Sequence, residues 1–204
     1  ARLCLLTAHR VNGEETETCD ADMVVHGAGR VPEIDDLELE AAGVARTESG
    51  VSVNDYLQSV SNPAVYAAGD AAASGGLPLT PVAGMEGGIV ADNLLKGNHR
   101  RPDYAGVPTV VYTIPPLASV GLQETAAHHQ GLRLAVKHED TSSWYSSRRV
   151  RLQYSAYKVL VEEGTDRILG AHLLGLHAEE IINIFALAIR AGLPAAALRD
   201  MVYA

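Results

Sequence analysis

The sequence predicts a mixed chain of α/β and α+β class with two regions, and three observations carry this prediction. A short apolar run ends in Gly69-Asp70 and is followed by a helix that opens at Thr80-Pro81, which is the strand, turn and helix order of an α/β domain. Further along, two apolar runs flank a short hairpin loop, and a long amphipathic helix follows them. The polar stretch 98–108, which contains two prolines, separates the two patterns and predicts a domain boundary.

The composition is that of an acidic globular protein. The chain has 204 residues, 47% of them hydrophobic, which is enough for one or two domains with a buried core. A net charge of -9, spread along the chain, argues against binding nucleic acid or an anionic membrane surface. No apolar run approaches the roughly 20 residues that span a bilayer. We therefore expect a cytoplasmic protein with no nucleic-acid and no membrane partner.

The cysteines and the first residues exclude further classes. Cys4 and Cys19 do not make a disulfide framework, and their spacing fits neither a CxxC motif nor a zinc site, so we interpret them as ordinary thiols. The opening run, residues 1–8, is apolar but has no signal-peptide cleavage site after it. A chain that opens inside a strand suggests a fragment of a longer protein.

Short strands and one short helix are expected in the first region, punctuated by turn residues. Asn12-Gly13 indicates a hairpin turn, Gly27-Ala28-Gly29 interrupts regular structure, and Gly43 is expected to end the short helix. The expected elements are strands over Arg2–Thr7, Ala21–Val25, Val51–Asn54 and Ala64–Ala68, and a helix over Leu37–Ala42.

A longer helix closes the first region. Thr80 is a good N-cap residue, and Pro81 at the first helical position loses no needed donor. The helix is expected to run to about Leu95 and to end at Gly97. Because each interior glycine costs roughly 1 kcal/mol against alanine, the three in this helix indicate close packing against a flat surface or another backbone. They are Gly84, Gly87 and Gly88.

The second region is predicted to hold several strands and one strong helix. Strands are expected over Thr109–Thr113, Leu132–His138, Tyr157–Glu162 and Ile168–Leu174. The helix is expected over Ala178–Ala191, where apolar residues recur at helical spacing and Gly192 and Pro194 follow. Those apolar residues are Ile181, Ile182, Phe185, Ala188 and Ile189. A further element is expected to start at Leu198–Tyr203.

The chemistry of the first region centres on a carboxylate and a helix N-terminus. A strand that ends in Gly69-Asp70 would place the carboxylate where α/β sheets bind ligands, and it could accept hydrogen bonds from paired ribitol hydroxyls. The helix N-terminus at 80–82 favours an anion. Each pattern alone also fits a plain turn or tight helix–sheet packing. Together they form a workable cradle for a flavin, whose reduced ring is anionic and hangs from a ribitol chain.

Several segments resemble one family. Residues 28–32, 65–70 and 79–83 resemble, in order and spacing, the second FAD-domain segment of the glutathione reductase, dihydrolipoamide dehydrogenase and mercuric reductase family. Residues 107–124 resemble the family's entry into its interface domain, and residues 158–183 resemble the rest of that domain. The resemblance covers nearly the whole chain and identifies it as the C-terminal half of a pyridine nucleotide-disulfide oxidoreductase.

The resemblance implies a domain plan and a set of cofactor contacts. Residues 1–25 would end the NAD(P)H-binding domain, residues 26–100 would form the second segment of the FAD-binding domain, and residues 105–204 would form a dimerisation domain of antiparallel sheet and helices. The parent would bind FAD and NAD(P)H and form a homodimer. The cofactor-binding residues would be Gly29, Gly69, Asp70, Thr80, Pro81 and Val82.

Other parts of the family pattern are missing from this sequence. It has neither Gly-rich dinucleotide fingerprint, since Pro32 stands at the third glycine position after Gly27-Ala28-Gly29. It has no CxxxxC redox pair and no His-Pro segment, and Glu33 stands where the family often has Asn. We therefore assign no catalytic residue and no metal site, and we expect the chain alone to be inactive.

Two other functions stay open at this point. One is a stand-alone dimerisation module without cofactor or catalysis, and the other is a related flavoenzyme such as an NADH oxidase. The remaining polar clusters are interpreted as surface features. These are His128-His129, the basic group Arg148, Arg149 and Arg151 at a strand edge or subunit contact, and the acidic group Glu162, Glu163 and Asp166 at a hairpin tip.

Overall fold

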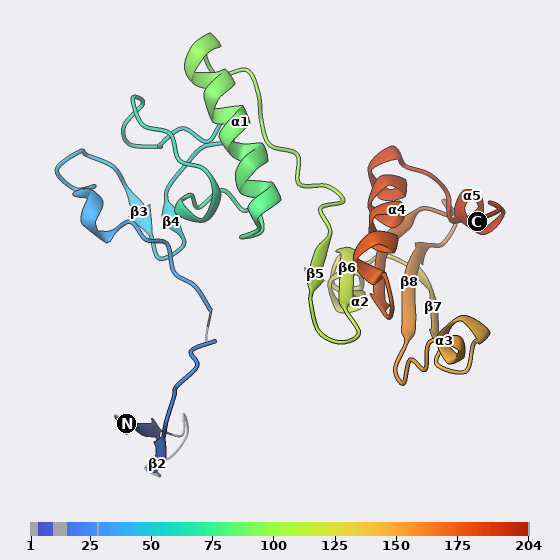
Figure 1. The fold of residues 1–204 in the computed structure, drawn as a ribbon. Coiled ribbons are helices and arrows are strands. Elements are labelled where there is room, and N and C mark those ends of the chain that lie inside the picture. Colours follow the sequence, from blue (N-terminus) through green and yellow to red (C-terminus); the bar gives the residue numbers. More distant parts are fainter. Residues whose placement is uncertain (1–3, 10–15, 28, 204) are drawn as a thin grey trace. The chain divides into compact units, whose positions relative to one another are not determined.

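The computed structural model describes residues 4–9, 16–27 and 29–203, which divide into two compact units (Figure 1). The first unit comprises residues 1–102 and the second comprises residues 103–204. The predicted turn at Asn12-Gly13 and the expected role of Ala28 lie outside the described residues. Within the described part of the chain, no helix is long and apolar enough to cross a membrane.

The first unit contains short elements joined by turns. Its strands form two antiparallel pairs, β1 with β2 and β3 with β4. Two single 3₁₀ turns and the long helix α1 complete it. In chain order the elements are β1 (Cys4–His9), β2 (Thr16–Ala21), η1 (Asp35–Leu37), β3 (Arg46–Thr47), β4 (Gly50–Val51), η2 (Gly69–Ala71) and α1 (Thr80–Lys96).

The strand predicted over Ala21–Val25 is wrong, because the strand lies earlier in the chain. β2 pairs with β1 from His9↔Thr16 to Cys4↔Ala21. The ladder therefore ends at Ala21, and the residues that follow have no strand to pair with among the described residues. Met23 and Val25 are 77% and 85% exposed. Cys19, on β2, is an exposed free thiol.

Two further predictions in this unit are wrong for reasons of backbone geometry. The helix expected over Leu37–Ala42 is replaced by η1, because Glu38 adopts a left-handed φ of 49° directly after it. The segment Ala64–Ala68 forms no strand. Its pairing is limited to one antiparallel bridge between Tyr66 and Gln58, flanked by the Ser59 N–H donating to the Val65 carbonyl and the Ala67 N–H donating to the Leu57 carbonyl, and a single bridge is too short to make a strand.

Helix α1 begins one residue before the expected start. Leu79 is the N-cap, and the first α-helical bond runs from Ala83 N–H to Leu79 O at 2.9 Å. Thr80 therefore lies inside the helix and its predicted capping role is wrong, while Gly97 follows the last residue as expected. The predicted close packing of the three glycines is also wrong within the described residues. A Cβ on Gly84, Gly87 or Gly88 would have no atom within 4 Å.

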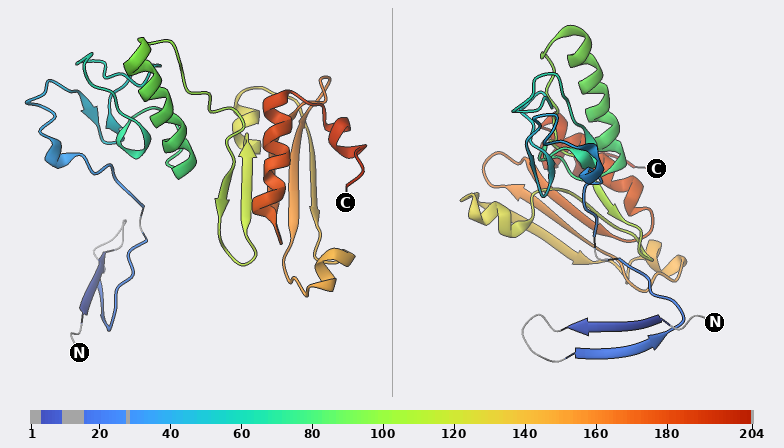
Figure 2. Two further views of the ribbon diagram at one scale, coloured as in Figure 1. Left: turned by 45° about the horizontal axis from the view of Figure 1, so that its top comes forward. Right: turned by 90° about the vertical axis from the view of Figure 1, so that its left-hand side faces the viewer.

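The second unit is one five-stranded antiparallel sheet with helices. The strand order is β5-β6-β9-β8-β7, and every neighbouring pair is antiparallel. Helix α4 lies across one face of the sheet (Figure 2). The elements are β5 (Thr109–Val111), β6 (Leu117–Gly121), α2 (Glu124–His129), β7 (Leu134–Asp140), α3 (Tyr145–Arg149), β8 (Ala156–Glu162), β9 (Ile168–Leu174), α4 (Ala178–Ala191) and α5 (Ala195–Arg199).

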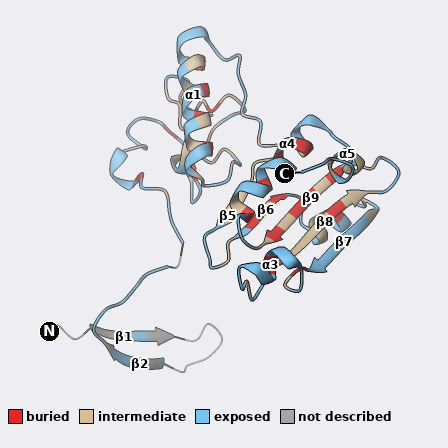
Figure 3. Ribbon diagram, turned by 45° about the vertical axis from the view of Figure 1, so that its right-hand side comes forward, coloured by how far each residue is buried: buried red, intermediate tan, exposed pale blue. Residues whose placement is uncertain are grey.

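The core of this unit lies between α4 and the central strands, as the burial colours in Figure 3 show. Alternate residues of β6 and β9 point toward the helix because side chains alternate across a strand. The buried members are Ala118, Val120, Ala171, Leu173, Ala178, Ile182 and Ala186. The predicted mixture of helices with an antiparallel sheet is confirmed in this unit, and the predicted bounds of β9 and α4 are those observed.

Three further predictions about the second unit differ from the structure. Arg148 and Arg149 lie on the short helix α3 and not on a strand edge, while a role in a subunit contact stays a prediction. Glu162 is an ion-paired residue, because Arg167 contacts it at 2.8 Å and its side chain is only 16% exposed. The final element is the short helix α5, which starts before the expected Leu198 because the Ala196 N–H donates to Asp166.

Candidate functional site

The structure brings the turn at Gly69-Asp70 against the first turn of α1. Gly69 adopts a left-handed φ of 63°, and a Cβ at this position would lie 2.8 Å from the Ala83 Cβ. A side chain at position 69 would therefore be strained and would also collide with the helix. The Ala72 N–H donates to Gly69 O at 3.0 Å and closes the 3₁₀ turn η2. Asp70 thus stands on a tight turn fixed to α1.

Asp70 is more exposed than the sequence suggested. Its side chain is 42% exposed and forms an ion pair with Arg30, with 2.8 Å between Arg30 Nη1 and Asp70 Oδ2. The predicted position of Asp70 at the end of a strand is wrong, because residues 64–68 form no strand. Arg30 also donates through Nη2 to the Pro78 carbonyl. One guanidinium therefore joins the Asp70 turn to the segment that leads into α1.

The N-terminus of α1 presents backbone rather than side-chain groups. Thr80 and Pro81 are exposed, whereas the Val82 side chain is buried. Among the described residues, no side chain caps this end of the helix. The first N–H groups of any helix lack partners within the helix and carry part of its positive dipole. This end of α1 can therefore attract an anionic or electron-rich group placed near it.

A buried carboxylate holds the two parts of the site together. Glu86 is 0% exposed and lies on the inner stripe of α1. Its Oε2 accepts the Gly69 N–H at 2.6 Å, and its Oε1 accepts the Ser74 hydroxyl at 2.7 Å. The sequence analysis missed Glu86. The available signal was a charged residue in line with Val82 and Ile89, four and three positions away on the buried side of the helix.

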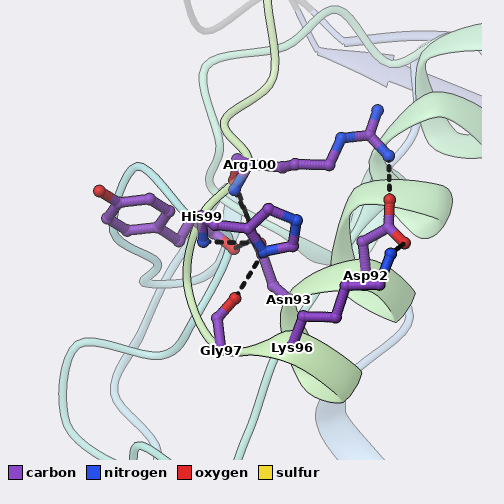
Figure 4. A network of polar contacts seen from close by, with 7 residues as sticks. Asp92, Asn93, Lys96, Gly97, His99 and Arg100 are labelled. Atoms are coloured by element: carbon purple, nitrogen blue, oxygen red, sulfur yellow. Dashed lines mark hydrogen bonds and ion pairs between the residues drawn. The ribbon is translucent and has the colours of Figure 1, made fainter.

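The other end of α1 is held by a second buried polar side chain, Asn93 (Figure 4). Its amide nitrogen donates to the carbonyls of Tyr56 and Arg100, and its Oδ1 accepts the N–H groups of His99 and Arg100. Next to it, Arg100 and Lys96 bind Asp92. These contacts, of which the one to Arg100 is the largest, lower the pKa of the Asp92 carboxyl.

Of the six predicted cofactor-binding residues, Gly69 and Asp70 are brought directly to the helix that carries Thr80, Pro81 and Val82. Gly29 lies next in the chain to Arg30, which contacts Asp70. Gly29 has a left-handed φ of 96° and no atom within 4 Å of a built Cβ. Five of the six residues therefore lie at η2 and the first turn of α1, and Gly29 is connected to them only through its chain neighbour Arg30.

The second unit has a polar cluster on the opposite face of its sheet from α4. His172 on β9 pairs across the strands with Ser119 on β6 and Lys158 on β8. His172 Nε2 donates to the Leu122 carbonyl at 3.2 Å, so Nδ1 accepts the Ser119 hydroxyl at 2.5 Å. Burial, followed by the charge of Lys158, lowers the pKa of His172, although the bond to Leu122 opposes this. Lys158 is itself paired with Glu124 at 2.7 Å.

The described residues contain no group of three or more side chains suited to a metal ion. His128 and His129 are both exposed at the end of α2. His128 lies 4.0 Å from Glu124, its neighbour one helical turn away. The candidate sites that remain are therefore the Asp70 turn, the uncapped end of α1 and the cluster around His172.

Comparison with protein families gives two adjacent matches. Residues 5–87 match the family described as pyridine nucleotide-disulphide oxidoreductase. Residues 107–204 match the pyridine nucleotide-disulphide oxidoreductase dimerisation domain. The two matches follow each other along the chain and together include all six predicted cofactor-binding residues.

Among similar proteins, an uncharacterised 19.7 kDa protein in a mercuric resistance operon of Staphylococcus aureus is 48% identical over 82% of this chain and 93% of its own length. Mercuric reductase of the same organism is 36% identical over 93% of this chain. The HOCl-induced flavoprotein disulfide reductase RclA of Escherichia coli is 30% identical, with a TM-score of 0.81 over 97% of this chain. The chain spans 34% of that mercuric reductase and 44% of RclA.

Proposed function

Because the chain belongs to the pyridine nucleotide-disulphide oxidoreductase family, we propose that it supplies part of an FAD site and a homodimer interface to an FAD-dependent NAD(P)H oxidoreductase. One observation carries the proposal most directly. The Gly69-Asp70 turn lies against the uncapped first turn of α1, close to Ala83, and the Gly69 N–H is bonded to Glu86 of the same helix. These are the two parts that the ribitol and the pyrimidine ring of a flavin require.

The residues present fit this half of a flavin. Arg30 uses Asp70 Oδ2, and a carboxylate offers about four lone-pair sites in all, so ribitol hydroxyls can share Asp70 with Arg30. The backbone at Thr80, Pro81 and Val82 would face the pyrimidine ring. Gly29, whose built Cβ meets no neighbour, would allow close approach to the cofactor's edge. When bound, FAD supplies the electron transfer, and these residues hold and orient it.

The domain plan is part of the same proposal. Residues 1–25 would end the NAD(P)H-binding domain, residues 26–100 would belong to the FAD-binding domain, and residues 105–204 would form the dimerisation domain. NAD(P)H would bind to the parent enzyme, and a cytoplasmic location remains a prediction. We expect the chain alone to show no NAD(P)H-dependent disulfide reduction. Turnover by the purified chain with added FAD and a disulfide substrate would contradict this expectation.

The homodimer is proposed through the second unit. Helix α4 buries one side against the sheet but leaves apolar side chains on its other side, with Ile181, Ile184 and Leu187 at 43%, 40% and 65% exposed. An exposed apolar stripe of this kind tends to associate. Analytical ultracentrifugation of the chain at micromolar concentration is expected to show dimers that Leu187→Glu dissociates. A wild-type chain that sediments only as a monomer would contradict the proposal.

The flavin assignment can be tested on the chain itself by following backbone amides in NMR during titration with FAD. We expect weak binding, on the order of 1 mM, because only one side of the cofactor is held. The largest shifts should occur at residues 69–71 and 80–83. Asp70→Ala should weaken binding about tenfold or more, since a charge-assisted hydrogen bond contributes roughly 1.5–3 kcal/mol.

A matched control is Asp35→Ala. Asp35 is also an exposed aspartate of the first unit that pairs with an arginine, Arg46 at 2.5 Å. This variant removes an equivalent ion pair but should leave FAD binding unchanged. Equal weakening by both variants, or wild-type shifts confined to other residues, would show that Asp70 is not a flavin ligand.

A second candidate function is a stand-alone dimerisation module without cofactor or catalysis. The observation that favours it is that residues 103–204 have one five-stranded sheet and their own core. The FAD titration separates the two functions. The module predicts dimers with no response of residues 69–71 to FAD, whereas the flavin proposal predicts dimers together with that response.

A further inference from the structure

We propose that Glu86 is a positioning residue that fixes the Gly69-Asp70 turn and thereby sets where the Asp70 carboxylate stands. The inference deepens the proposed function, and it rests on that function only for the identity of the ligand. The geometry it uses belongs to the first unit alone. It assigns a role to a buried charge that packing of α1 does not require.

The first argument is the cost of placing a carboxylate where Glu86 lies. The side chain is fully buried, on the same stripe of α1 as Val82, Ile89 and Asn93. An apolar residue there would leave the Gly69 N–H and the Ser74 hydroxyl without their acceptor, and a buried charge is strongly unfavourable unless it is hydrogen-bonded. Both oxygens of Glu86 are bonded, to Gly69 N–H at 2.6 Å and to Ser74 O–H at 2.7 Å. Bonds this short are typical of charge-assisted contacts.

The second argument is which groups the carboxylate holds. The Gly69 N–H precedes Asp70 by one peptide, so the direction of this N–H fixes the start of η2. Ser74 lies just beyond the turn, and its hydroxyl bonds to the other oxygen. Glu86 therefore binds the loop that carries Asp70 on both sides of that residue. A side chain at position 69 would need a left-handed φ and would meet Ala83, so the Gly69 backbone lies close to α1 where Glu86 binds it.

The third argument is a comparison within the same helix. Asn93 is the other fully buried polar side chain of α1, but its partners are Tyr56, His99 and Arg100. Asn93 therefore anchors α1 without touching the Asp70 turn. If Glu86 only anchored α1, replacing Glu86 or Asn93 would affect the Gly69-Asp70 turn equally. If Glu86 positions that turn, only the replacement of Glu86 should affect Gly69 and Asp70.

The test measures amide hydrogen exchange and proton chemical shifts in the full chain without ligand. In Glu86→Gln, the Gly69 amide should exchange about tenfold faster or more, because a bond to a charged acceptor is weakened or lost. Its proton resonance should also move upfield. In Asn93→Ala, the His99 and Arg100 amides should respond in this way while Gly69 keeps its wild-type shift.

A second variant covers the case in which Glu86→Gln does not fold. Ser74→Ala removes one partner of the carboxylate and keeps Glu86 itself, and it should also speed exchange at Gly69, by a smaller factor. An unchanged Gly69 amide in the folded variants would overturn the proposal. So would an equal change at Gly69 in Asn93→Ala. If Gly69 responds as expected but FAD shifts no amide of the wild-type chain, the positioning role stands and the flavin function fails.

Discussion

The two units bury different kinds of side chain. In residues 103–204 the largest fully buried side chains are Val120, Leu160 and Ile182, all apolar, whereas in residues 1–102 they are Leu57, Glu86 and Asn93. The second unit pairs five strands in one sheet. Among its described residues, the first pairs its strands two at a time, and it connects its loops to α1 through Glu86 and Asn93.

This difference indicates how each unit is stabilised. Apolar burial is non-directional and roughly proportional to area, so it gives the second unit a core that tolerates small shifts. Hydrogen bonds to buried polar groups contribute less net stability but demand defined geometry. We therefore expect the first unit to be the less stable of the two and to hold its loops in a defined geometry, which suits a region proposed to orient a cofactor.

The largest expected effect is the loss of apolar core in the second unit. Ile182→Ala should destabilise this unit by about 2–5 kcal/mol, the usual cost of removing a fully buried aliphatic side chain. Trp144 is the only tryptophan of the chain and lies in this unit, so its fluorescence during urea unfolding reports the change. Amide protection at Gly69 in the first unit should be unaffected, since the two cores are separate.

The control for this variant is Leu187→Ala on the same helix, where the side chain is 65% exposed. At a dilution that keeps the chain monomeric, it should change stability by no more than about 0.5 kcal/mol. A loss of Gly69 protection in Ile182→Ala that matches the loss at Trp144 would show that the units unfold together, and the comparison would then fail.

A pair of glycine substitutions tests the geometry of the first unit. Gly69→Ala should destabilise it by about 1–3 kcal/mol, because the new Cβ requires a left-handed φ and meets Ala83 at 2.8 Å. Gly84→Ala should stabilise it by about 0.5–1 kcal/mol, because Gly84 lies in a helix with open space around it. Hydrogen exchange at residues 69–96 measures both. A stable Gly69→Ala variant would mean that the turn is free to move away from α1.

The same contrast explains which elements could be predicted from the sequence. Ile168–Leu174 and Ala178–Ala191 have regular apolar periodicity, and each finds its packing partner within the second unit. Residues 64–68 look equally strand-like, but their pairing stops at a single bridge between Tyr66 and Gln58, which no local pattern reveals. The motif indicated Gly69 and Asp70 as candidate site residues, and their role as flavin ligands stays a prediction. The Glu86 contacts and the Arg30–Asp70 pair could not be predicted, because both depend on contacts between distant segments.

The smallest expected effect distinguishes the units by pH. Burial lowers the pKa of His172 from 6.5 in the folded second unit, so the unfolded chain binds the proton more readily. The stability associated with neutral His172 is therefore fully present above pH 6.5 and is lost as the pH falls through the lowered folded value. In the first unit, ion pairs lower the pKa of the Asp92 carboxyl from 3.8. The stability that depends on ionised Asp92 is therefore lost only below that pH. The urea midpoint of unfolding, followed by Trp144 fluorescence, should fall as the pH is lowered from 7.5 to 5. Protection of the Asn93 and Arg100 amides from hydrogen exchange should stay constant over the same range.

His172→Gln can keep a donor toward Leu122 and an acceptor toward Ser119 but cannot titrate, so it should flatten the pH profile of the Trp144 midpoint. His138→Gln, on the exposed edge strand β7, serves as the control and should leave the slope unchanged. A slope that persists in His172→Gln would assign the pH dependence to another group and remove this difference between the units.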